Sequence, residues 1–229
     1  MKLVIWGSTG FVGTELIRQA LSHPGIRTVV GISRHATPVP PESADKKGKL
    51  RSIICNDFEN YPDSVMKELE TADACIWTIA VTPTKLKSIP WDETVKICRD
   101  YALTAIKTLA GFPRYRRENG PGPVRFVYIS DHFAPHNRSD VMKPLNDYGL
   151  TDLALLRGEL ETRLLTMADE SNGAVVSCIA KPGRIAGPGR DSQVVPGLPK
   201  IELSVIAAAL IDQAVNGLEK DILSNDDMI

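Results

Sequence analysis

Residues 2–21, KLVIWGSTGFVGTELIRQAL, pass from an apolar run into three glycines spaced three apart, and then into a helical pattern. The glycines are Gly7, Gly10 and Gly13. Glycine allows positive φ angles and close backbone approach, and the start of a helix presents unpaired N–H groups with a partial positive charge. The stretch therefore predicts a strand, a phosphate-binding turn and a helix in succession, which together favour a dinucleotide site. A purely structural strand-to-helix turn is the alternative.

Short apolar runs rich in β-branched residues alternate with longer segments of helical period along the rest of the chain. We expect strands at residues 2–6, 28–33, 52–55, 74–80, 124–130 and 174–180. We expect helices at 9–22, 63–70, 92–109, 151–167 and 202–216, followed by a polar tail that frays. Such alternation is typical of parallel strands joined by right-handed crossovers. The sequence thus predicts one α/β domain over 1–229 with a doubly wound parallel sheet.

Ligands of a doubly wound sheet bind beyond the carboxyl ends of its strands, where the strand order reverses. The irregular segments that follow predicted strands are therefore the candidate functional regions. Residues 131–150 and 182–200 are long and rich in Pro, Gly and polar residues, and we expect them to form the substrate side.

Bulk properties exclude several classes of partner. The 229 residues carry 27 Lys and Arg against 28 Asp and Glu, so the formal charge of -1 gives no reason to expect nucleic acid or a membrane surface as partner. No apolar run approaches the ~18 residues that span a bilayer. The four cysteines lie apart and lack metal-ligand spacing. We expect buried reduced thiols, no bound metal, and a cytoplasmic monomer or homodimer.

The end of the second predicted strand indicates which nicotinamide cofactor would bind. NAD selection uses an acidic residue about 20 positions after the glycines, but no Asp or Glu occurs between Glu15 and Glu42. Ser33 and Arg34 stand in that place. A guanidinium can bind a 2′-phosphate in bidentate fashion, and such charge-assisted bonds contribute about 1.5–3 kcal/mol. NADP(H) is the predicted cofactor, and an ordinary surface arginine is the alternative.

With these motifs in order, the chain resembles the atypical short-chain dehydrogenase/reductase group, close to NmrA-like and NAD(P)-binding Rossmann proteins. The likeness covers most of the chain. It rests on GSTGFVG (7–13), GISR (31–34), CNDF (55–58), VYIS (127–130), RGELE (157–161) and AKPGRIAGPG (180–189).

The resemblance implies a place for each part of the cofactor. It implies that the adenine lies near Asp57 and Phe58, and the nicotinamide near Pro182 and Gly183. The ribose and pyrophosphate would lie along residues 79–81. The full expected cofactor set is Gly7, Ser8, Thr9, Gly10, Phe11, Val12, Gly13, Ser33, Arg34, Asp57, Phe58, Ile79, Ala80, Val81, Pro182 and Gly183. Ser8 and Thr9 have helix capping as an alternative role.

One departure from the family pattern concerns proton transfer. Reductases of the group carry a Tyr and a Lys four residues apart, and aligning RGELE puts Leu153 and Arg157 at these positions. Leucine has no proton to donate, and arginine stays charged. The candidates that remain are Ser130 to polarise a carbonyl, with His132 or Tyr148 to supply the proton. Their alternatives are a strand-end serine, an incidental loop histidine and a packing tyrosine.

Three functions are compatible with these observations. The first is an NADPH-dependent reductase or dehydrogenase acting on a small apolar or aromatic carbonyl or enone. The second is an NADP-sensing regulator of the NmrA kind that has lost turnover. The third is an isomerase, epimerase or dehydratase on the same scaffold. Fold alone does not separate them, because function depends on the site.

Overall fold

A computed structural model describes residues 1–113, 122–190 and 197–229. Its centre is a seven-stranded sheet in the order β3-β2-β1-β4-β5-β6-β9, in which every neighbouring pair is parallel. The predicted doubly wound α/β fold is confirmed. The strands are β1 (Lys2–Trp6), β2 (Thr28–Ser33), β3 (Leu50–Ile54), β4 (Ala74–Trp77), β5 (Val124–Ile129), β6 (Val175–Ala180) and β9 (Ile222–Leu223).

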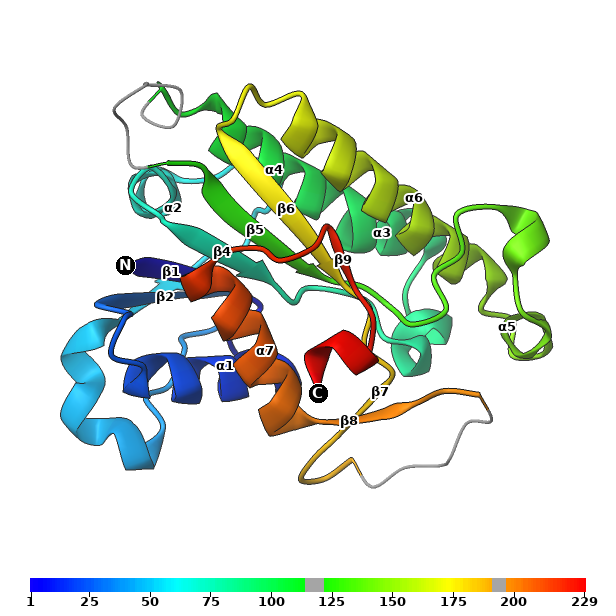
Figure 1. Ribbon diagram of the computed structural model, residues 1–229, viewed down its shortest axis with the longest axis horizontal. Helices are drawn as coiled ribbons and strands as arrows, with labels where there is room; N and C mark the ends of the chain where they lie inside the picture. Colours follow the sequence, from blue (N-terminus) through cyan, green and yellow to red (C-terminus); the bar gives the residue numbers. More distant parts are fainter. Residues whose placement is uncertain (114–121, 191–196) are drawn as a thin grey trace.

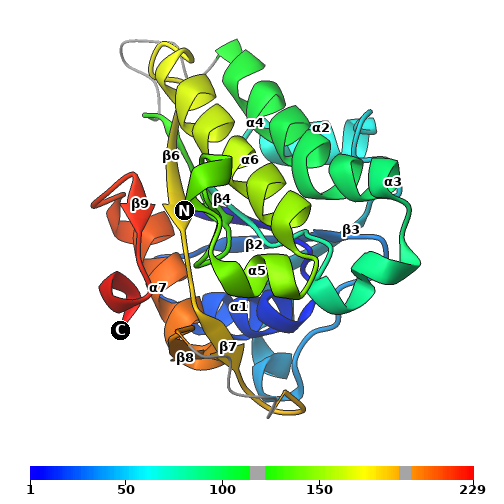
Figure 2. The same ribbon diagram turned by 90° about the vertical axis from the view of Figure 1, so that its right-hand side faces the viewer.

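Helices cover both faces of the sheet, as Figures 1 and 2 show. Helices α1 (Phe11–Ser22) and α7 (Leu203–Asn216) pack on one face, over a core that includes Leu3 and Ile5. Helices α2 (Asp63–Leu69), α4 (Tyr101–Gly111) and α6 (Thr151–Asp169) pack on the other, over a core that includes Val4 and Trp6. Alternate residues of one strand face opposite layers, so burial on both faces explains why the strands are apolar nearly throughout.

The strand order reverses at β1, which pairs with β2 on one side and β4 on the other. In register, Trp6 lies opposite Ile32 and Trp77, and Ile129 lies opposite Ala180. The residues that follow these strands therefore gather along one edge of the sheet. The glycine turn after β1 stands at the reversal, which is the place where ligands of such sheets bind.

Several connecting segments contain structure that the sequence did not predict. The helix expected over 92–109 is divided into α3 (Trp91–Val95), a π-helical turn (Lys96–Asp100) and α4. The additional elements are 3₁₀ helices at Pro41–Lys49, Pro83–Ser88 and Arg138–Asp140, a short α5 (Lys143–Asp147), and the pair β7 (Arg184–Ala186) and β8 (Lys200–Glu202). Residues 191–196 of the expected substrate-side segment 182–200 lie outside the described residues.

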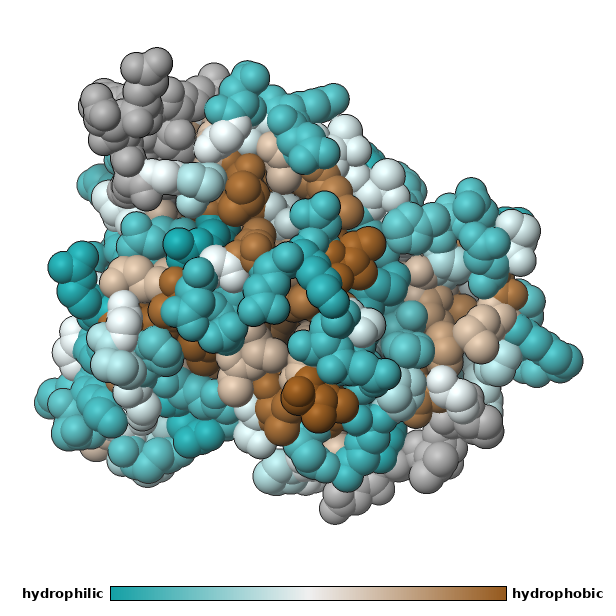
Figure 3. Space-filling model, in the orientation of Figure 1, coloured by the Kyte–Doolittle hydropathy of each residue, from teal (hydrophilic) through white to brown (hydrophobic). Residues whose placement is uncertain are grey.

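The expectation that the polar tail frays was wrong. The backbone N–H of Lys181 donates to the carbonyl of Leu223 at 2.8 Å, which adds β9 to the sheet beside β6. Leu223, Asn225 and Met228 are buried. A few apolar side chains at the right spacing thus hold the tail on the core despite its polar composition. Figure 3 shows a small hydrophobic area over the chain end, where Ile229 is exposed.

Candidate cofactor and active site

The glycine turn after β1 has a geometry that only glycine fits. Gly7 has φ +74°, and a Cβ there would lie 2.4 Å from Thr78 Oγ1. A Cβ on Gly13 would lie 2.2 Å from the Gly7 carbonyl oxygen, so the first turn of α1 packs directly against the turn. Gly10 precedes α1, and its N–H donates to the Gly7 carbonyl at 2.8 Å. The turn and the helix therefore form one close-packed unit.

The start of α1 is open to an anion. The first N–H groups of a helix have no partner within it, and here they belong to Phe11, Val12 and Gly13. No side chain caps this end, and no acidic residue lies in the first turn. The uncompensated N–H dipoles favour a phosphate at this position.

A cavity of about 360 Å³ opens beside this turn, at the carboxyl ends of β1, β2 and β4. Its volume lies within the range of small-molecule sites, about 300–1,000 Å³. Nine residues of the expected cofactor set line it, namely Gly7, Thr9, Gly10, Ser33, Arg34, Phe58, Ile79, Ala80 and Val81. The other lining residues are His35, Asn56, Thr78, Lys85, Ile89, Glu93, Ile97 and Tyr101.

The polar residues at the end of β2 form the charged side of this cavity. Ser33 Oγ donates to the His35 carbonyl at 2.5 Å and accepts from Thr9 Oγ1 at 3.3 Å. Arg34 is exposed, and its guanidinium has no hydrogen bond or ion pair within residues 1–113, 122–190 and 197–229. Glu93 is the acidic residue of the lining, and it comes from α3 rather than from the end of β2. Arg34 is thus free to pair with a ligand anion.

Two aromatic residues, Phe58 and Tyr101, also line this cavity. The rings of Phe58 and Tyr101 stack with centroids 5.3 Å apart. Trp6 continues the group inward, with its ring 6.1 Å from Phe58 and 5.1 Å from Trp77. A flat apolar wall beside a cationic rim suits a purine nucleotide.

Some residues of the expected set face away from the cavity. Ser8 is fully buried, and its hydroxyl lies 2.6 Å from Thr37 Oγ1. The Phe11 ring lies 4.1 Å from the Arg190 guanidinium and lines a separate cavity of about 420 Å³ with Ser8. Val12 packs against the core under α1 and α7. These three residues could contact a phosphate through their backbone N–H groups, while their side chains serve packing.

Three further residues of the set have structural partners. Asp57 accepts from the backbone N–H groups of Glu59 and Asn60 at 2.8 and 2.9 Å. These two N–H groups, that of Asn60 most, hold the pKa of Asp57 below its usual range. The Gly183 N–H donates to Asn225 Oδ1 at 2.9 Å, and Pro182 accepts from the His132 N–H at 3.1 Å. Asp57, Pro182 and Gly183 stand outside the cavity lining.

The structure does not join Ser130, His132 and Tyr148 into one hydrogen-bonded group. The Ser130 hydroxyl donates to Glu161 on α6. The His132 ring packs edge-on against Phe133 at 4.9 Å. Tyr148 follows α5 with 68% of its surface exposed. Their catalytic roles stay predictions.

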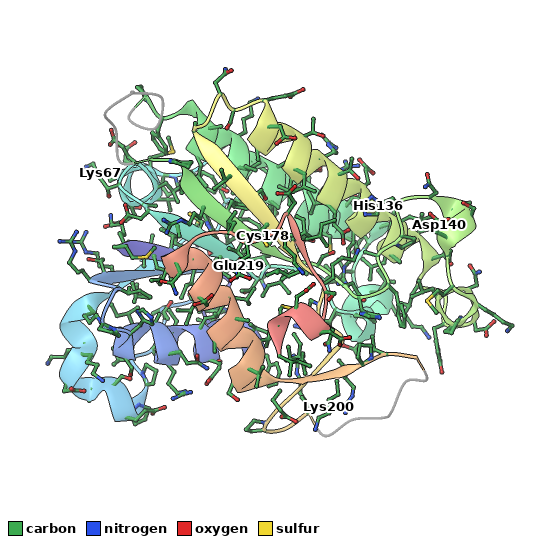
Figure 4. All side chains as sticks on the ribbon, viewed as in Figure 1. Lys67, His136, Asp140, Cys178, Lys200 and Glu219 are labelled. Atoms are coloured by element: carbon green, nitrogen blue, oxygen red, sulfur yellow. The ribbon has the colours of Figure 1, made fainter. Side chains whose placement is uncertain are left out.

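A charged group that the sequence analysis missed lies beneath Ser130. Glu161 is fully buried, and Lys181 Nζ donates to both its carboxylate oxygens at 2.8 and 2.7 Å. His136 Nε2 lies 3.0 Å from Glu161 Oε2, and Figure 4 shows His136 beside α6. Lys181 also donates to the Ala134 carbonyl at 2.9 Å. Glu161 therefore connects α6 to the loop after β5 and to the end of β6.

Arg157, at the expected position of the relay lysine, also acts as a connector. Its Nη1 donates to Asp131, and its Nη2 donates to the Val81 carbonyl at 3.0 Å. Leu153, at the tyrosine position, is buried in a small separate core with Val81 and Cys98. The sequence could have indicated this arrangement, because Leu153, Arg157 and Glu161 follow the four-residue spacing of one helix face.

Metal ligands, thiols and membrane spans can each be assessed over the described residues. Within the described parts of the chain, no three His, Cys, Asp or Glu side chains are placed to hold a metal ion. Cys55, Cys75, Cys98 and Cys178 are free and buried. None of the helices over 1–113, 122–190 and 197–229 has the length and apolar character needed to cross a bilayer.

Comparisons with known proteins show the fold. No family model matches the chain. An 88-residue segment is 24% identical to protein FMP52, mitochondrial, of Candida albicans, and it covers 38% of this chain but only 37% of that protein.

Solved structures match over nearly the whole chain. MoeE5 in complex with UDP-glucuronic acid and NAD is similar at a TM-score of 0.67 and 17% identity, over 98% of this chain and 76% of that one. Vestitone reductase from alfalfa is similar at 0.64 and 17% identity, over 97% and 74%. At these identities the likeness establishes the shared Rossmann-type α/β fold.

Proposed function

We propose that the protein is an NADP(H)-dependent reductase or dehydrogenase of the atypical short-chain type, acting on a small apolar or aromatic carbonyl or enone. The observation that carries the proposal is the cavity beside the glycine turn, with the unpaired Arg34 at its rim. The fold is shared with a named reductase and with a protein solved with NAD. The residues present fit a dinucleotide, because the uncapped N–H groups at the start of α1 follow directly on Gly10, which lines the cavity together with Gly7 and Arg34.

Arg34 supports NADP(H) over NAD(H). A ribose diol is recognised by a carboxylate at the end of β2, whereas a 2′-phosphate is recognised by a cation. The end of β2 presents Ser33 and Arg34 and no carboxylate. A bidentate guanidinium contact would favour the phosphorylated cofactor by about 1.5–3 kcal/mol.

The cofactor would supply the hydride, and the chain would supply binding, polarisation and a proton. The Ser130 hydroxyl donates to Glu161. To polarise a carbonyl, that hydroxyl would have to turn from Glu161 toward the substrate. His132 is the better proton source, since its imidazole has no hydrogen-bond partner among the described residues. Its backbone N–H donates to the Pro182 carbonyl and so connects the two substrate-side loops.

A second candidate is a sensor that binds NADP(H) without turnover. The specific observation in its favour is that Leu153 and Arg157 occupy the relay positions and both serve packing and connection. Such a protein would keep the cofactor cavity and recognise a protein partner according to the redox state of the bound nucleotide.

Titration calorimetry with NADPH and NADH tests the cofactor assignment. Wild type should bind NADPH more tightly, and Arg34→Glu should weaken NADPH by about 2–4 kcal/mol more than NADH, because repulsion adds to the lost contact. Lys107→Glu, a charge reversal on the exposed side of α4, is the control and should change neither affinity. Equal losses for both cofactors in Arg34→Glu would remove the NADP assignment.

Turnover separates the two candidate functions. A panel of aliphatic and aromatic carbonyls and enones, followed by loss of NADPH absorbance, should reveal activity if the protein is a reductase. Tight NADPH binding with no activity across the panel would favour the sensor.

A further inference from the structure

Two lysines lie close together on the 3₁₀ helix Pro83–Ser88, which follows β4. A 3₁₀ helix repeats every three residues and so presents three faces. Leu86 on one face, and Ile89 just after the helix, pack against the small core around Val81 and Leu153. Lys85 and Lys87 project from the other two faces, and both are exposed. Lys85 lines the cofactor cavity, and Lys87 does not.

The backbone before Lys85 is bonded to two other elements, and the turn that carries Lys85 has hydrogen bonds of its own. The Val81 N–H donates to Cys98 Sγ at 3.2 Å, and the Val81 carbonyl accepts from Arg157 at 3.0 Å. The Lys85 N–H donates to the Thr82 carbonyl at 2.9 Å, and Ser88 Oγ donates to the Lys85 carbonyl at 2.9 Å. The backbone of the segment is therefore tied to the body of the protein at Val81, and Lys85 extends from it into the cavity lining.

The Lys85 ammonium is available for a ligand. It has no hydrogen bond or ion pair within the described part of the chain. Arg34 follows β2 and Lys85 follows β4, the two strands on either side of β1, and both residues line the same cavity. Glu93 is the one acidic residue of the lining. Two free cations in a cavity beside a glycine turn indicate a ligand with more than one phosphate group.

We propose that Lys85 binds a phosphate of the dinucleotide, from a segment that Arg157 holds through the Val81 carbonyl. The proposal rests on the proposed function, since it names a further ligand of the same cofactor. It also gives Arg157 a role that does not require proton transfer.

The two lysines form a matched pair for the test. We would measure the dissociation constants of NADPH, NADH and ADP for wild type, Lys85→Gln and Lys87→Gln by titration calorimetry at one ionic strength. Lys85→Gln should weaken NADPH about tenfold, which corresponds to about 1.4 kcal/mol. Lys87→Gln should change it by less than about twofold, because surface charges away from a site contribute little.

The affinity losses of Lys85→Gln for the three nucleotides show which phosphate Lys85 contacts. Equal losses for NADPH, NADH and ADP in Lys85→Gln would assign Lys85 to the pyrophosphate. A loss confined to NADPH would assign it to the 2′-phosphate. Either result supports the proposal.

Two other outcomes overturn it, and they differ in what they say of the proposed function. Wild type that binds NADPH, with equal affinities in the two lysine variants, would overturn the role of Lys85 and leave the proposed function standing. Wild type that binds none of the three nucleotides would overturn both.

Discussion

The buried pair of Glu161 and Lys181 offers a quantitative test of what holds the candidate active site together. Glu161 is fully buried, and the Lys181 side chain is 16% exposed. At 2.7 Å, two unit charges attract by about 6 kcal/mol at an effective dielectric constant near 20. Removing each charge from water costs several kcal/mol, so the net contribution of the pair is small. The protein loses stability when one partner is removed, because the other charge is then buried without a counter-charge.

We therefore expect each single substitution to destabilise the protein strongly. Glu161→Gln keeps the shape but leaves the ammonium without its counter-charge, and Lys181→Met leaves the carboxylate with only Ser130 and His136. Breaking a buried pair costs about 3–5 kcal/mol. The double variant loses both charges, so it should be at least as stable as either single variant.

Urea unfolding followed by tryptophan fluorescence measures these free energies, because Trp6 and Trp77 are buried beside the cofactor cavity. The coupling energy of the cycle should be at least about 3 kcal/mol in favour of the pair. Single losses below about 1 kcal/mol, or a double loss equal to the sum of the singles, would refute a buried and coupled charge pair at this place.

Two further changes test the glycine turn and the thiols. Gly7→Ala should greatly weaken NADPH binding, because the new Cβ would lie 2.4 Å from Thr78 Oγ1 and displace the turn. Gly173→Ala, with a similar φ of +76° but nothing within 4 Å of its Cβ, should lower the free energy of unfolding by about 1–2 kcal/mol through backbone strain and leave NADPH affinity unchanged. Equal NADPH affinities in the two variants by calorimetry would contradict the role of the close-packed turn. Burial raises the pKa of Cys178 to about 12 and raises those of Cys55, Cys75 and Cys98, so at about pH 8 the folded protein holds thiols rather than reactive thiolates. A disulfide reagent should then label the four cysteines only after unfolding, and rapid labelling of the folded protein would contradict their burial.

The central sheet could be predicted from sequence because its signal is local. The strands at Lys2–Trp6 and Thr28–Ser33 have the predicted boundaries, since strands covered on both faces read as apolar runs. The parallel sense of the strands followed from the β-α alternation. The π-helical turn at Lys96–Asp100 had no such signal, because it adds a residue to a helix without changing its composition.

Much of the candidate site depends on contacts between distant parts of the chain, which a single sequence does not show. Lys85 reaches the cofactor cavity from the irregular segment after the strand expected at 74–80, and Tyr101 reaches it from the helix expected at 92–109. Glu161 lies in a quoted motif, but its partner Lys181 is 20 residues further on. The tail after α7 was misread because polar composition outweighed the burial of Leu223 and Met228.

The row Leu153, Arg157 and Glu161 determines how a reaction at this site would have to proceed. In this chain Leu153 packs in a small core. Arg157 bonds to Val81 and Asp131. Glu161 accepts hydrogen bonds from Ser130 and Lys181. Arg157 and Glu161 are both already engaged, so this row of α6 has no free group to protonate a substrate. A reductase built on this chain must take its proton from His132, Tyr148 or water. Since water is always present, loss of His132 and Tyr148 together should lower turnover but leave NADPH affinity unchanged, and a sensor would show no difference in either quantity.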